Sequence, residues 1–534
     1  MRPRRGGVAV PSLAAGVLLA LSLPPFGAWP VAFLGAALLF WRLGGLRLRA
    51  RLFAGWLAGV GCFAIGLYWA VDFNWYGAVV LVLVEAGFVA LAAAATPPVR
   101  GRVPAFIGAA TLLEAARQSW PFGGLPVGGV YLGQAGGPLV GAARLGGPLL
   151  LTALVFAGGA GLAEVAGRLR RTTGPARSGM AGMAGMAGMV ALVAVVAVGV
   201  AGALAPDGGP AVATLRVAAV QGGGVRGFTA LETGRAGDFA AELAATEPLV
   251  WARPRPELVL WPEDVIAIGV PVAASTPGRA VSALALRLRA TVLAGVTVLV
   301  GTSRFRNEIV AWGPDGRILG EFEKVHRVPF GEYVPFRGFF SHLASLAAVP
   351  RDAIAGHGTG LLRTPAAPVG VLVSFEVFFA GRARSSVRAG ARLLVVPTNT
   401  SSYSSEQMPS QEVAADQVQA VSEGRDLVQA SPTGYSTFVT NTGVVTRQSG
   451  LSERAVLSGP VALRRGATVY ARFGDLPVLV LAGLGVAAGL AAELRWRRRA
   501  GAGHPDGAPP SGRRLAHRPE GGARVGGWTN PRPC

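Results

Sequence analysis

Lysine and cysteine are almost missing from this chain. Lys324 is the single lysine among 50 basic residues, and Cys62 and Cys534 are the two cysteines in 534 residues. Arginine is a permanently charged planar fork, whereas lysine is a compact ammonium whose protonation can be tuned. The one retained lysine therefore indicates chemistry that a guanidinium does not perform. Because no cysteine lies between residues 206 and 475, that stretch has no disulfide framework and no cysteine metal site.

Charged residues are also scarce. They make up 15% of the chain, against about 25% in soluble globular proteins, and mean hydropathy is +0.45. Apolar stretches near the length of a bilayer crossing predict a multi-pass α-helical membrane bundle. The eight candidate spans are Val8–Leu23, Trp29–Trp41, Phe53–Val71, Gly77–Ala95, Pro104–Ala116, Pro148–Ala166, Met186–Leu204 and Leu476–Leu494.

Arginines gather in alternate loops between these spans. The arginine clusters are at residues 2–5, 42–51, 100–102, 168–177 and 495–499. By the positive-inside rule, the N-terminus is expected in the cytoplasm and residue 206 outside. Much of the net charge of +21 is then a topology signal, and the basic loops would meet anionic lipid, so we expect no nucleic-acid partner. The predicted organisation is a membrane bundle (1–205), an extracytoplasmic domain (206–475), a last transmembrane helix (476–494) and a basic disordered cytoplasmic tail (495–534).

The pattern changes after residue 206 to alternating strands and helices, which predicts an α/β layered domain. The expected strands are Val212–Val220, Leu258–Trp261, Thr297–Phe305, Glu308–Trp312, Arg317–Phe322, Val369–Val373 and Leu393–Pro397. The expected helices are Leu231–Thr246, Ala280–Thr291 and Arg382–Ala389.

Reactive side chains follow three of these strands. Glu263, Lys324 and Ser374 each come directly after a strand or its last residues. Because chemistry in such domains gathers at the carboxyl ends of strands, we expect the three to share one site. Each alone is also compatible with a solvated loop.

Motifs of other hydrolases are missing. There is no Gly-x-Ser-x-Gly elbow, and the only lysine has Glu321 three residues before it, which excludes a Ser-x-x-Lys pair. No glycine-rich phosphate loop with a following lysine is present, and we expect neither a metal nor another cofactor. His326 is a candidate base, but its basic, loop-rich segment is more typical of a surface residue.

Several segments together resemble the apolipoprotein N-acyltransferase family, a membrane branch of the nitrilase superfamily. They are Trp261-Pro262-Glu263, residues 324–335, Ser374-Phe375-Glu376, Val220-Gln221-Gly222, Gly434-Tyr435-Ser436, Pro24-Pro25-Phe26-Gly27 and residues 114–126. The resemblance covers nearly all of residues 8–494, and the segment from Lys324 to Pro335 is its most specific part. It implies an α-β-β-α sandwich joined to a membrane bundle.

The resemblance also implies roles for single residues. Glu263 matches the family's general base and Lys324 its oxyanion-stabilising lysine, while Glu332 matches a second acid of the site. Ser374 stands where the family has a cysteine nucleophile, with Phe375 and Glu376 completing that motif. A serine hydroxyl is a far weaker nucleophile than a thiol with a pKa of about 8.5, so it must give its proton to a base.

The implied reaction moves a fatty acyl group from a phospholipid to the N-terminal amine of a diacylglyceryl-cysteine lipoprotein. Two alternatives stay open. One is a catalytically silent relative that binds lipid or anchors a partner glycosyltransferase, which Ser374 favours. The other is a membrane-bound amidohydrolase of the nitrilase type, which would pass the acyl group to water.

Overall fold

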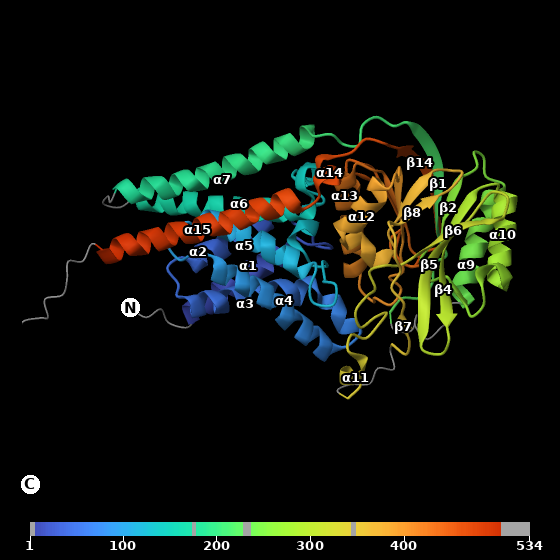
Figure 1. Ribbon diagram of the computed structural model, residues 1–534, viewed down its shortest axis with the longest axis horizontal. Coiled ribbons are helices and arrows are strands. Elements are labelled where there is room, and N and C mark those ends of the chain that lie inside the picture. The colour runs from blue at the N-terminus through green and yellow to red at the C-terminus, as the bar shows by residue number, and fades with distance from the viewer. Residues whose placement is uncertain (1–5, 173–177, 228–235, 343–348, 503–534) are drawn as a thin grey trace, which may run out of the picture. The chain divides into compact units, whose positions relative to one another are not determined.

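The computed structural model describes residues 6–172, 178–227, 236–342 and 349–502. Each of the eight predicted spans overlaps one helix (Figure 1). These helices are α1 (Gly6–Leu21), α2 (Val31–Leu43), α3 (Leu48–Gly66), α4 (Trp75–Ala95), α5 (Arg102–Arg117), α6 (Ala143–Thr172), α7 (Ser178–Leu204) and α15 (Leu476–Ala502). Among the described residues, five segments are long and apolar enough to cross a membrane: Leu48–Gly66, Trp75–Ala95, Val140–Leu169, Met186–Leu204 and Leu476–Ala500. Helices α1 and α2 are apolar but shorter than a membrane span. Helix α5 belongs neither to the candidate spans nor to these shorter apolar helices.

The bundle packs through small residues. A Cβ added at Gly59 of α3 would lie 2.5 Å from the Cα atom of Ala86 in α4, so only glycine permits this approach. Close backbone contact of this kind is what holds helices together in a lipid environment, where apolar burial gives no preference for protein over lipid.

Two arginines near the start of α5 make polar contacts with other helices. A guanidinium nitrogen of Arg102, which begins α5, lies 3.9 Å from a carboxylate oxygen of Glu164 near the end of α6. The backbone N–H of Arg100 donates to the carboxylate of Glu493 in α15 at 2.8 Å.

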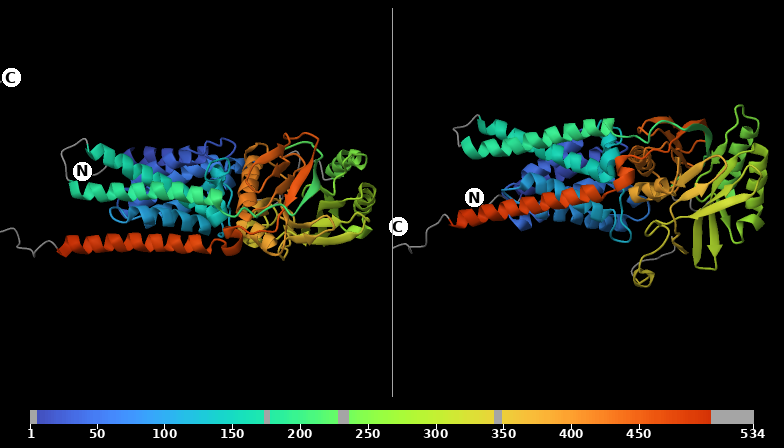
Figure 2. Two further views of the ribbon diagram at one scale, coloured as in Figure 1. Left: turned by 90° about the horizontal axis from the view of Figure 1, so that it is seen from above. Right: turned by 45° about the horizontal axis from the view of Figure 1, so that its top comes forward.

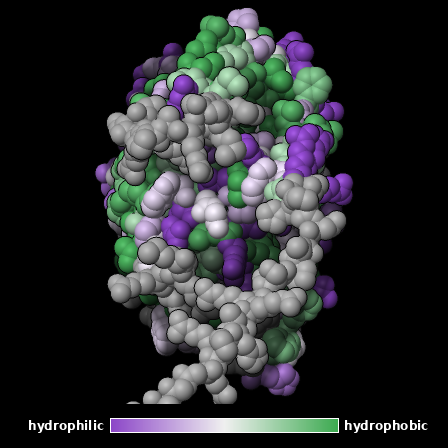
Figure 3. Space-filling model, turned by 90° about the vertical axis from the view of Figure 1, so that its left-hand side faces the viewer, coloured by the Kyte–Doolittle hydropathy of each residue, from purple (hydrophilic) through white to green (hydrophobic). Residues whose placement is uncertain are grey.

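On the face drawn in Figure 3, hydrophilic and hydrophobic residues are interspersed.

The segment after α7 folds into two stacked sheets with helices outside (Figure 2). The first sheet has the order β14-β1-β2-β4-β5-β6, with β3 beside β4 and β7 beside β5; the second has the order β13-β12-β11-β10-β9-β8. The strands of the first are β1 (Ala213–Gln221), β2 (Leu258–Leu260), β3 (Ile266–Ile268), β4 (Thr291–Val300), β5 (Arg304–Trp312), β6 (Ile318–Glu323), β7 (Asp352–Ala353) and β14 (Ala455–Leu463). Those of the second are β8 (Leu361–Arg363), β9 (Pro368–Val371), β10 (Leu393–Pro397), β11 (Leu427–Ala430), β12 (Thr437–Val439) and β13 (Val445–Gln448).

Three apolar layers follow from this arrangement. Residues such as Leu258 and Val395 of the two sheets form the core between them. Helices α9 (Ala236–Thr246) and α10 (Thr276–Leu288) cover the first sheet. Helices α12 (Ala380–Arg388) and α13 (Gln407–Glu423) cover the second, in a cluster that also contains Phe63 and Tyr131 of the bundle. The predicted α-β-β-α order is confirmed, and the second helical layer is the one that meets the bundle.

Three predicted boundaries are wrong. The span Phe53–Val71 begins earlier, at Leu48, and ends at Gly66, where the short turn η1 (Tyr68–Asp72) follows. The helix Ala280–Thr291 ends at Leu288, because Arg289 turns left-handed (φ 55°) and β4 starts at Thr291.

The predicted strand Thr297–Phe305 is two strands. The left-handed Gly301 (φ 63°) lies in the turn between β4 and β5. The first part of the predicted helix Leu231–Thr246 lies outside the described residues, and α9 covers the rest. The remaining predicted strands and the helix Arg382–Ala389 are confirmed within a few residues.

Helix α13 connects the sandwich to the bundle through two glutamines. The side chain of Gln407 accepts from the backbone N–H of Trp69 at 3.0 Å and donates to the carbonyl of Ile65 at 2.7 Å. Gln411 accepts from Gly128 N–H and donates to Gly66 O, both at 2.9 Å. The two amides thus satisfy carbonyl groups of Ile65 and Gly66 at the end of α3, which no further turn of that helix could pair.

Candidate active site

Lys324 lies buried between two carboxylates. It directly follows β6, and its Nζ atom is 2.9 Å from Glu263 Oε1 and 2.7 Å from Glu332 Oε1. Asn307 of β5 donates to the same two oxygens, at 2.7 and 3.3 Å. The prediction that Glu263 and Lys324 converge at strand ends is confirmed, with Glu332 on the other side of the ammonium.

Local backbone contacts hold these groups in place. The backbone N–H of Lys324 donates to Asn307 O at 2.8 Å and continues the β5–β6 pairing. The second oxygen of Glu332 accepts from the N–H of Val328 at 2.8 Å, so the loop between the lysine and the glutamate folds back on itself.

The charges of this cluster are shifted by burial and by each other. Burial raises the pKa of Glu263 to about 7, against the opposing effect of Lys324. Burial alone would lower the pKa of Lys324, but the carboxylates of Glu263 and Glu332 outweigh it and raise that pKa above its usual value. The ammonium is therefore kept protonated, as a group that stabilises an oxyanion must be.

Ser374 begins a short 3-10 turn, η6 (Ser374–Phe378), after the second sheet's strand β9. Its backbone is left-handed (φ 49°), a rare conformation for a side chain other than glycine, asparagine or aspartate. Backbone strain of this kind is typical of functional sites. The Oγ atom, on a residue that is 8% exposed, donates to Glu412 Oε1 at 3.4 Å.

Glu412 is a site residue that the sequence analysis missed. It lies on α13, where it also accepts from Thr398 Oγ1 at 2.8 Å. Burial raises its pKa to about 8, with Glu263 raising it further and Lys324 lowering it. Glu412 thus contacts Ser374 and interacts electrostatically with Glu263 and Lys324.

The carboxylate of Glu376 accepts hydrogen bonds from backbone N–H groups. One oxygen accepts from the N–H groups of Val325 and His326, at 2.9 and 3.1 Å, and the other accepts from Val373 N–H at 3.0 Å. The Arg382 guanidinium lies 3.4 Å away. Glu376 therefore ties the segment after Lys324 to the turn that carries Ser374.

A cavity of about 290 Å³ lies between the loop after α5 and the loops that follow Lys324 and Ser374. It is lined by Phe122, Gly123, Gly124, Val325, His326, Arg327, Tyr333, Phe375 and Phe379. Tyr333 Oη donates to Phe122 O at 3.0 Å, which links the loop after α5 to the loop after Lys324.

His326 is not the plain surface residue that the sequence favours. It is half-buried, and its ring stacks on Phe379 with the centroids 4.2 Å apart. Burial lowers its pKa to about 4, so the imidazole is neutral near pH 7. The phenyl ring of Phe375 packs edge-on against Phe379, which completes an aromatic wall of the cavity.

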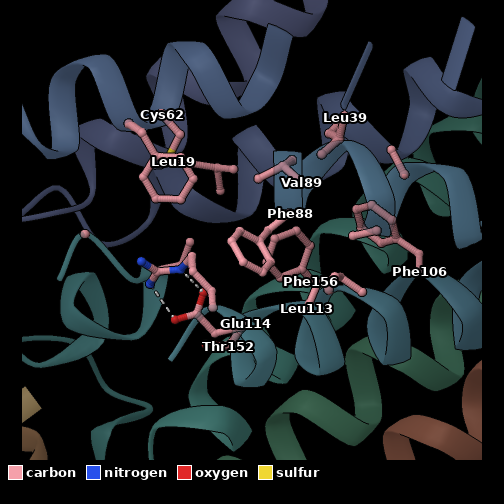
Figure 4. A pocket seen from close by; sticks show the side chains of 17 residues that line it. Leu19, Leu39, Cys62, Phe88, Val89, Phe106, Leu113, Glu114, Thr152 and Phe156 are labelled. Carbon is pink, nitrogen blue, oxygen red and sulfur yellow. Dashed lines mark hydrogen bonds and ion pairs between the residues drawn. The ribbon is translucent and has the colours of Figure 1, made fainter. Parts of the chain in front are cut away.

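A second, smaller cavity of about 60 Å³ lies within the helical bundle (Figure 4). Leu19, Leu39 and Phe106 are among its apolar walls, and the linked pair Glu114 and Arg117 closes one side. It contains none of the predicted site residues. Within the described ranges, no three His, Cys, Asp or Glu side chains are grouped so that they could hold a metal ion.

Two family models match the chain. The apolipoprotein N-acyltransferase N-terminal domain matches residues 15–161, and carbon-nitrogen hydrolase matches residues 216–469. An apolipoprotein N-acyltransferase of Azotobacter vinelandii is 30% identical over 89% of this chain and 92% of its own length. The chain belongs to the apolipoprotein N-acyltransferase family.

Other relatives and structures are similar over less of the chain or at lower identity. The enzyme of that name from Pseudomonas paraeruginosa is 28% identical over 89% of this chain and 93% of its own length. The one from Mycolicibacterium smegmatis is 30% identical, and the match spans 43% of this chain and 40% of that protein. A branch 10 nitrilase-superfamily structure from Saccharomyces cerevisiae covers 47% of this chain and 90% of its own, at 17% identity and a TM-score of 0.37.

Proposed function

We propose that this chain transfers a fatty acyl group from a phospholipid to the N-terminal amine of a diacylglyceryl-cysteine lipoprotein, through an acyl ester on Ser374. The observation that carries the proposal is the buried ammonium of Lys324, which is held between the carboxylates of Glu263 and Glu332. The names of the relatives support this substrate class.

In the first half-reaction, Ser374 Oγ attacks the ester carbonyl carbon of the phospholipid. An ammonium has three N–H donors, and Lys324 directs two at Glu263 and Glu332. The third is available for the carbonyl oxygen as it becomes an oxyanion, together with the backbone N–H of Phe375. One such donor contributes about 10²–10³ in rate. Collapse of the intermediate releases the lysophospholipid alcohol and leaves the acyl-Ser374 ester.

In the second half-reaction, the lipoprotein amine attacks the same carbonyl. Its C–N bond forms, the C–Oγ bond breaks, and the excess amine proton goes to a carboxylate. Glu263 suits this role, because a carboxyl whose pKa is about 7 both accepts and returns a proton near neutral pH.

The architecture fits substrates that are embedded in a bilayer. The cavity is walled by Phe122 of the bundle and by Tyr333 of the sandwich, so an acyl chain can enter from the membrane side. We place the sandwich (206–475) on the extracytoplasmic face and the arginine-rich loops, with the tail from residue 495, in the cytoplasm. The division into a bundle (1–205) and a last span (476–494) belongs to the same proposal.

One assay separates this function from the alternatives. The purified full chain in detergent is given a phospholipid with a labelled acyl chain and a diacylated lipopeptide. Triacylated peptide supports transfer, and free fatty acid supports the amidohydrolase alternative, for which the carbon-nitrogen hydrolase match is the supporting observation. No turnover supports a silent homologue that binds lipid or a glycosyltransferase.

Ser374→Ala and Ser374→Cys test the nucleophile in that assay. We expect the alanine variant to lose turnover by about 10³-fold or more, since the acyl ester has no other site, and the cysteine variant to keep or raise the rate. Equal activity of the alanine variant would remove Ser374 from the mechanism.

A further inference from the structure

Ser374 Oγ has a carboxylate partner on a third element of the site. Among the described residues, its hydrogen-bond acceptor is Glu412 Oε1 on α13, at 3.4 Å. Glu263, the base implied by family resemblance, has its Oε1 occupied by Lys324 at 2.9 Å and by Asn307 at 2.7 Å. The carboxylate that contacts the reacting hydroxyl is thus a different one from the carboxylate that contacts the ammonium.

The Glu412 carboxylate is fixed in position, and one of its oxygens can accept a proton. The side chain is 1% exposed, and Thr398 Oγ1 donates to its Oε1 atom at 2.8 Å. Its Oε2 atom is buried and has no hydrogen-bond partner among the described residues. The preceding residue, Gln411, bonds two backbone groups of the bundle, so α13 cannot rotate away from Ser374 without breaking them.

We propose that Glu412 is the base that takes the hydroxyl proton of Ser374 during acyl-enzyme formation. This assignment rests on the proposed acyl transfer. It goes further by giving the serine at this position its own proton acceptor, separate from Glu263. A contact of 3.4 Å is long, but catalytic hydrogen bonds often shorten only when substrate is bound.

The step is balanced in atoms and electrons. The Ser374 O–H bond breaks, its proton goes to Glu412, and the Oγ–C bond forms at the ester carbonyl. When the tetrahedral intermediate collapses, the bond from carbon to the glycerol oxygen breaks, and Glu412 gives the proton to that oxygen. In the second half-reaction the C–Oγ bond breaks and Ser374 Oγ takes the proton that the attacking amine gave to Glu263, so the hydroxyl is restored and Glu412 is left ionised.

A hydroxyl needs this partner more than a thiol does. A cysteine with a pKa of about 8.5 is partly ionised near neutrality, and a neighbouring ammonium such as Lys324 increases that fraction. A serine hydroxyl keeps its proton until a base removes it in the transition state. We therefore expect Glu412 to matter when residue 374 is serine and to matter little when it is cysteine.

The groups that face Glu412 keep its carboxyl within reach of neutral pH. Asp416 lies one turn later on α13, Tyr403 lies in the preceding loop, and Glu263 and Lys324 face it from the first sheet. Burial, with a smaller effect from Glu263, raises the pKa of Glu412 to about 8, while the hydrogen bond from Thr398 and the charge of Lys324 oppose the rise. A base with such a pKa accepts a proton from a weak acid and returns it without a large barrier.

The test is a double-mutant cycle of Glu412→Gln and Ser374→Cys in the full chain. The measured quantity is the rate of acyl-enzyme formation from a labelled phospholipid, without lipopeptide. We expect Glu412→Gln to lower this rate by about 100-fold or more in the serine protein, as loss of a general base does. In the Ser374→Cys protein we expect the same change to cost about threefold or less.

Glu423→Gln is the matched control. Glu423 is also fully buried on α13 and also has a pKa raised by burial to about 8, but it has no contact with Ser374. Its substitution should leave the rate unchanged. Glu412→Asp, which withdraws the carboxylate by one methylene, should give an intermediate rate that still rises with pH.

Two outcomes would overturn the assignment while leaving the proposed function intact. One is an equal loss in the serine and cysteine proteins, which means that Glu412 only supports the fold. The other is a normal rate for Glu412→Gln in the serine protein. Absence of any acyl-enzyme in both the wild-type and Ser374→Cys proteins would instead overturn the proposed function and this assignment with it.

Discussion

The bundle and the sandwich each bury one cation between two carboxylates, yet they use it differently. In the bundle, Arg117 lies 2.7 Å from Glu114 and 3.3 Å from Glu85. It also donates to the carbonyls of Leu125, Pro126 and Val127 in the following loop. In the sandwich, Lys324 contacts Glu263 and Glu332.

The two cations differ in how many of their N–H donors are bound by acceptors of the protein. Arg117 uses its guanidinium nitrogens to bind both carboxylates and to fix the loop that begins the cavity wall, so it stabilises the fold. The Lys324 ammonium has two carboxylate acceptors, and in the proposed mechanism its third N–H serves the substrate. A planar guanidinium suits the binding of several fixed acceptors in the fold, and a compact ammonium suits the proposed contact with a substrate. This difference explains why a chain rich in arginine retains this lysine.

The largest effect is expected from Lys324→Arg. A guanidinium is too broad to sit between Glu263 and Glu332 while directing a donor at the substrate carbonyl. We expect transfer of the acyl group to fall by about 10³-fold, the upper range for loss of an oxyanion donor. The measurement is the rate of triacylated lipopeptide formation; a rate within tenfold of wild type would contradict the role given to the ammonium.

Arg117→Lys should give the opposite phenotype. An ammonium cannot reach both carboxylates and the three loop carbonyls, so buried acceptors lose their donors. We expect the free energy of unfolding to fall by about 2–3 kcal/mol, while the rate per folded molecule stays within about twofold. Denaturant unfolding in detergent measures the first and the transfer assay the second. A variant that is stable but inactive would show that the two clusters are not separate.

Glu376→Gln should have a smaller effect on the site. The amide replaces one carboxylate oxygen by an NH2 group, which then faces a backbone N–H of Val325, His326 or Val373. We expect a roughly tenfold lower kcat, because the loop that follows Lys324 is displaced relative to Ser374. An unchanged kcat would indicate that the loop is held by its other contacts.

The smallest effect is a pH dependence of stability. Burial raises the pKa of Glu423 to about 8, so the folded protein binds a proton there that the unfolded chain releases above its ordinary pKa. The stability from this group is present below about pH 4.5 and is lost as pH rises to about 8, at about 1.4 kcal/mol per pH unit within that window. We expect Glu423→Gln to make unfolding less sensitive to pH between 5 and 8. An unaltered slope would contradict the assignment of this proton.

Much of the bundle and part of the site follow from the sequence. Apolar runs and the arginine pattern locate the helices, and the ends of strands locate Glu263, Lys324 and Ser374. Glu412 could not be found this way, because α13 has a polar sequence that gives no helical stripe and yet is almost wholly buried. Its Gln407 and Gln411 face the bundle while Glu412 faces the sandwich, which only the packing of the two parts reveals.

The role of Glu376 was also beyond sequence reasoning. Its position two residues after Ser374 marks it as part of the motif. Its carboxylate, however, accepts hydrogen bonds from backbone N–H groups about fifty residues earlier in the chain. Such long-range backbone contacts leave no pattern in composition or spacing. The left-handed turn at Gly301 separates two paired strands that the sequence analysis joined into one.

Intact-mass analysis of the full chain, incubated with a phospholipid in the absence of lipopeptide, tests the central claim most directly. We predict a mass increase of one acyl chain, located on Ser374, that is absent from Ser374→Ala and disappears when a diacylated lipopeptide is added. An acyl adduct on any other residue, or the same adduct in Ser374→Ala, would contradict it.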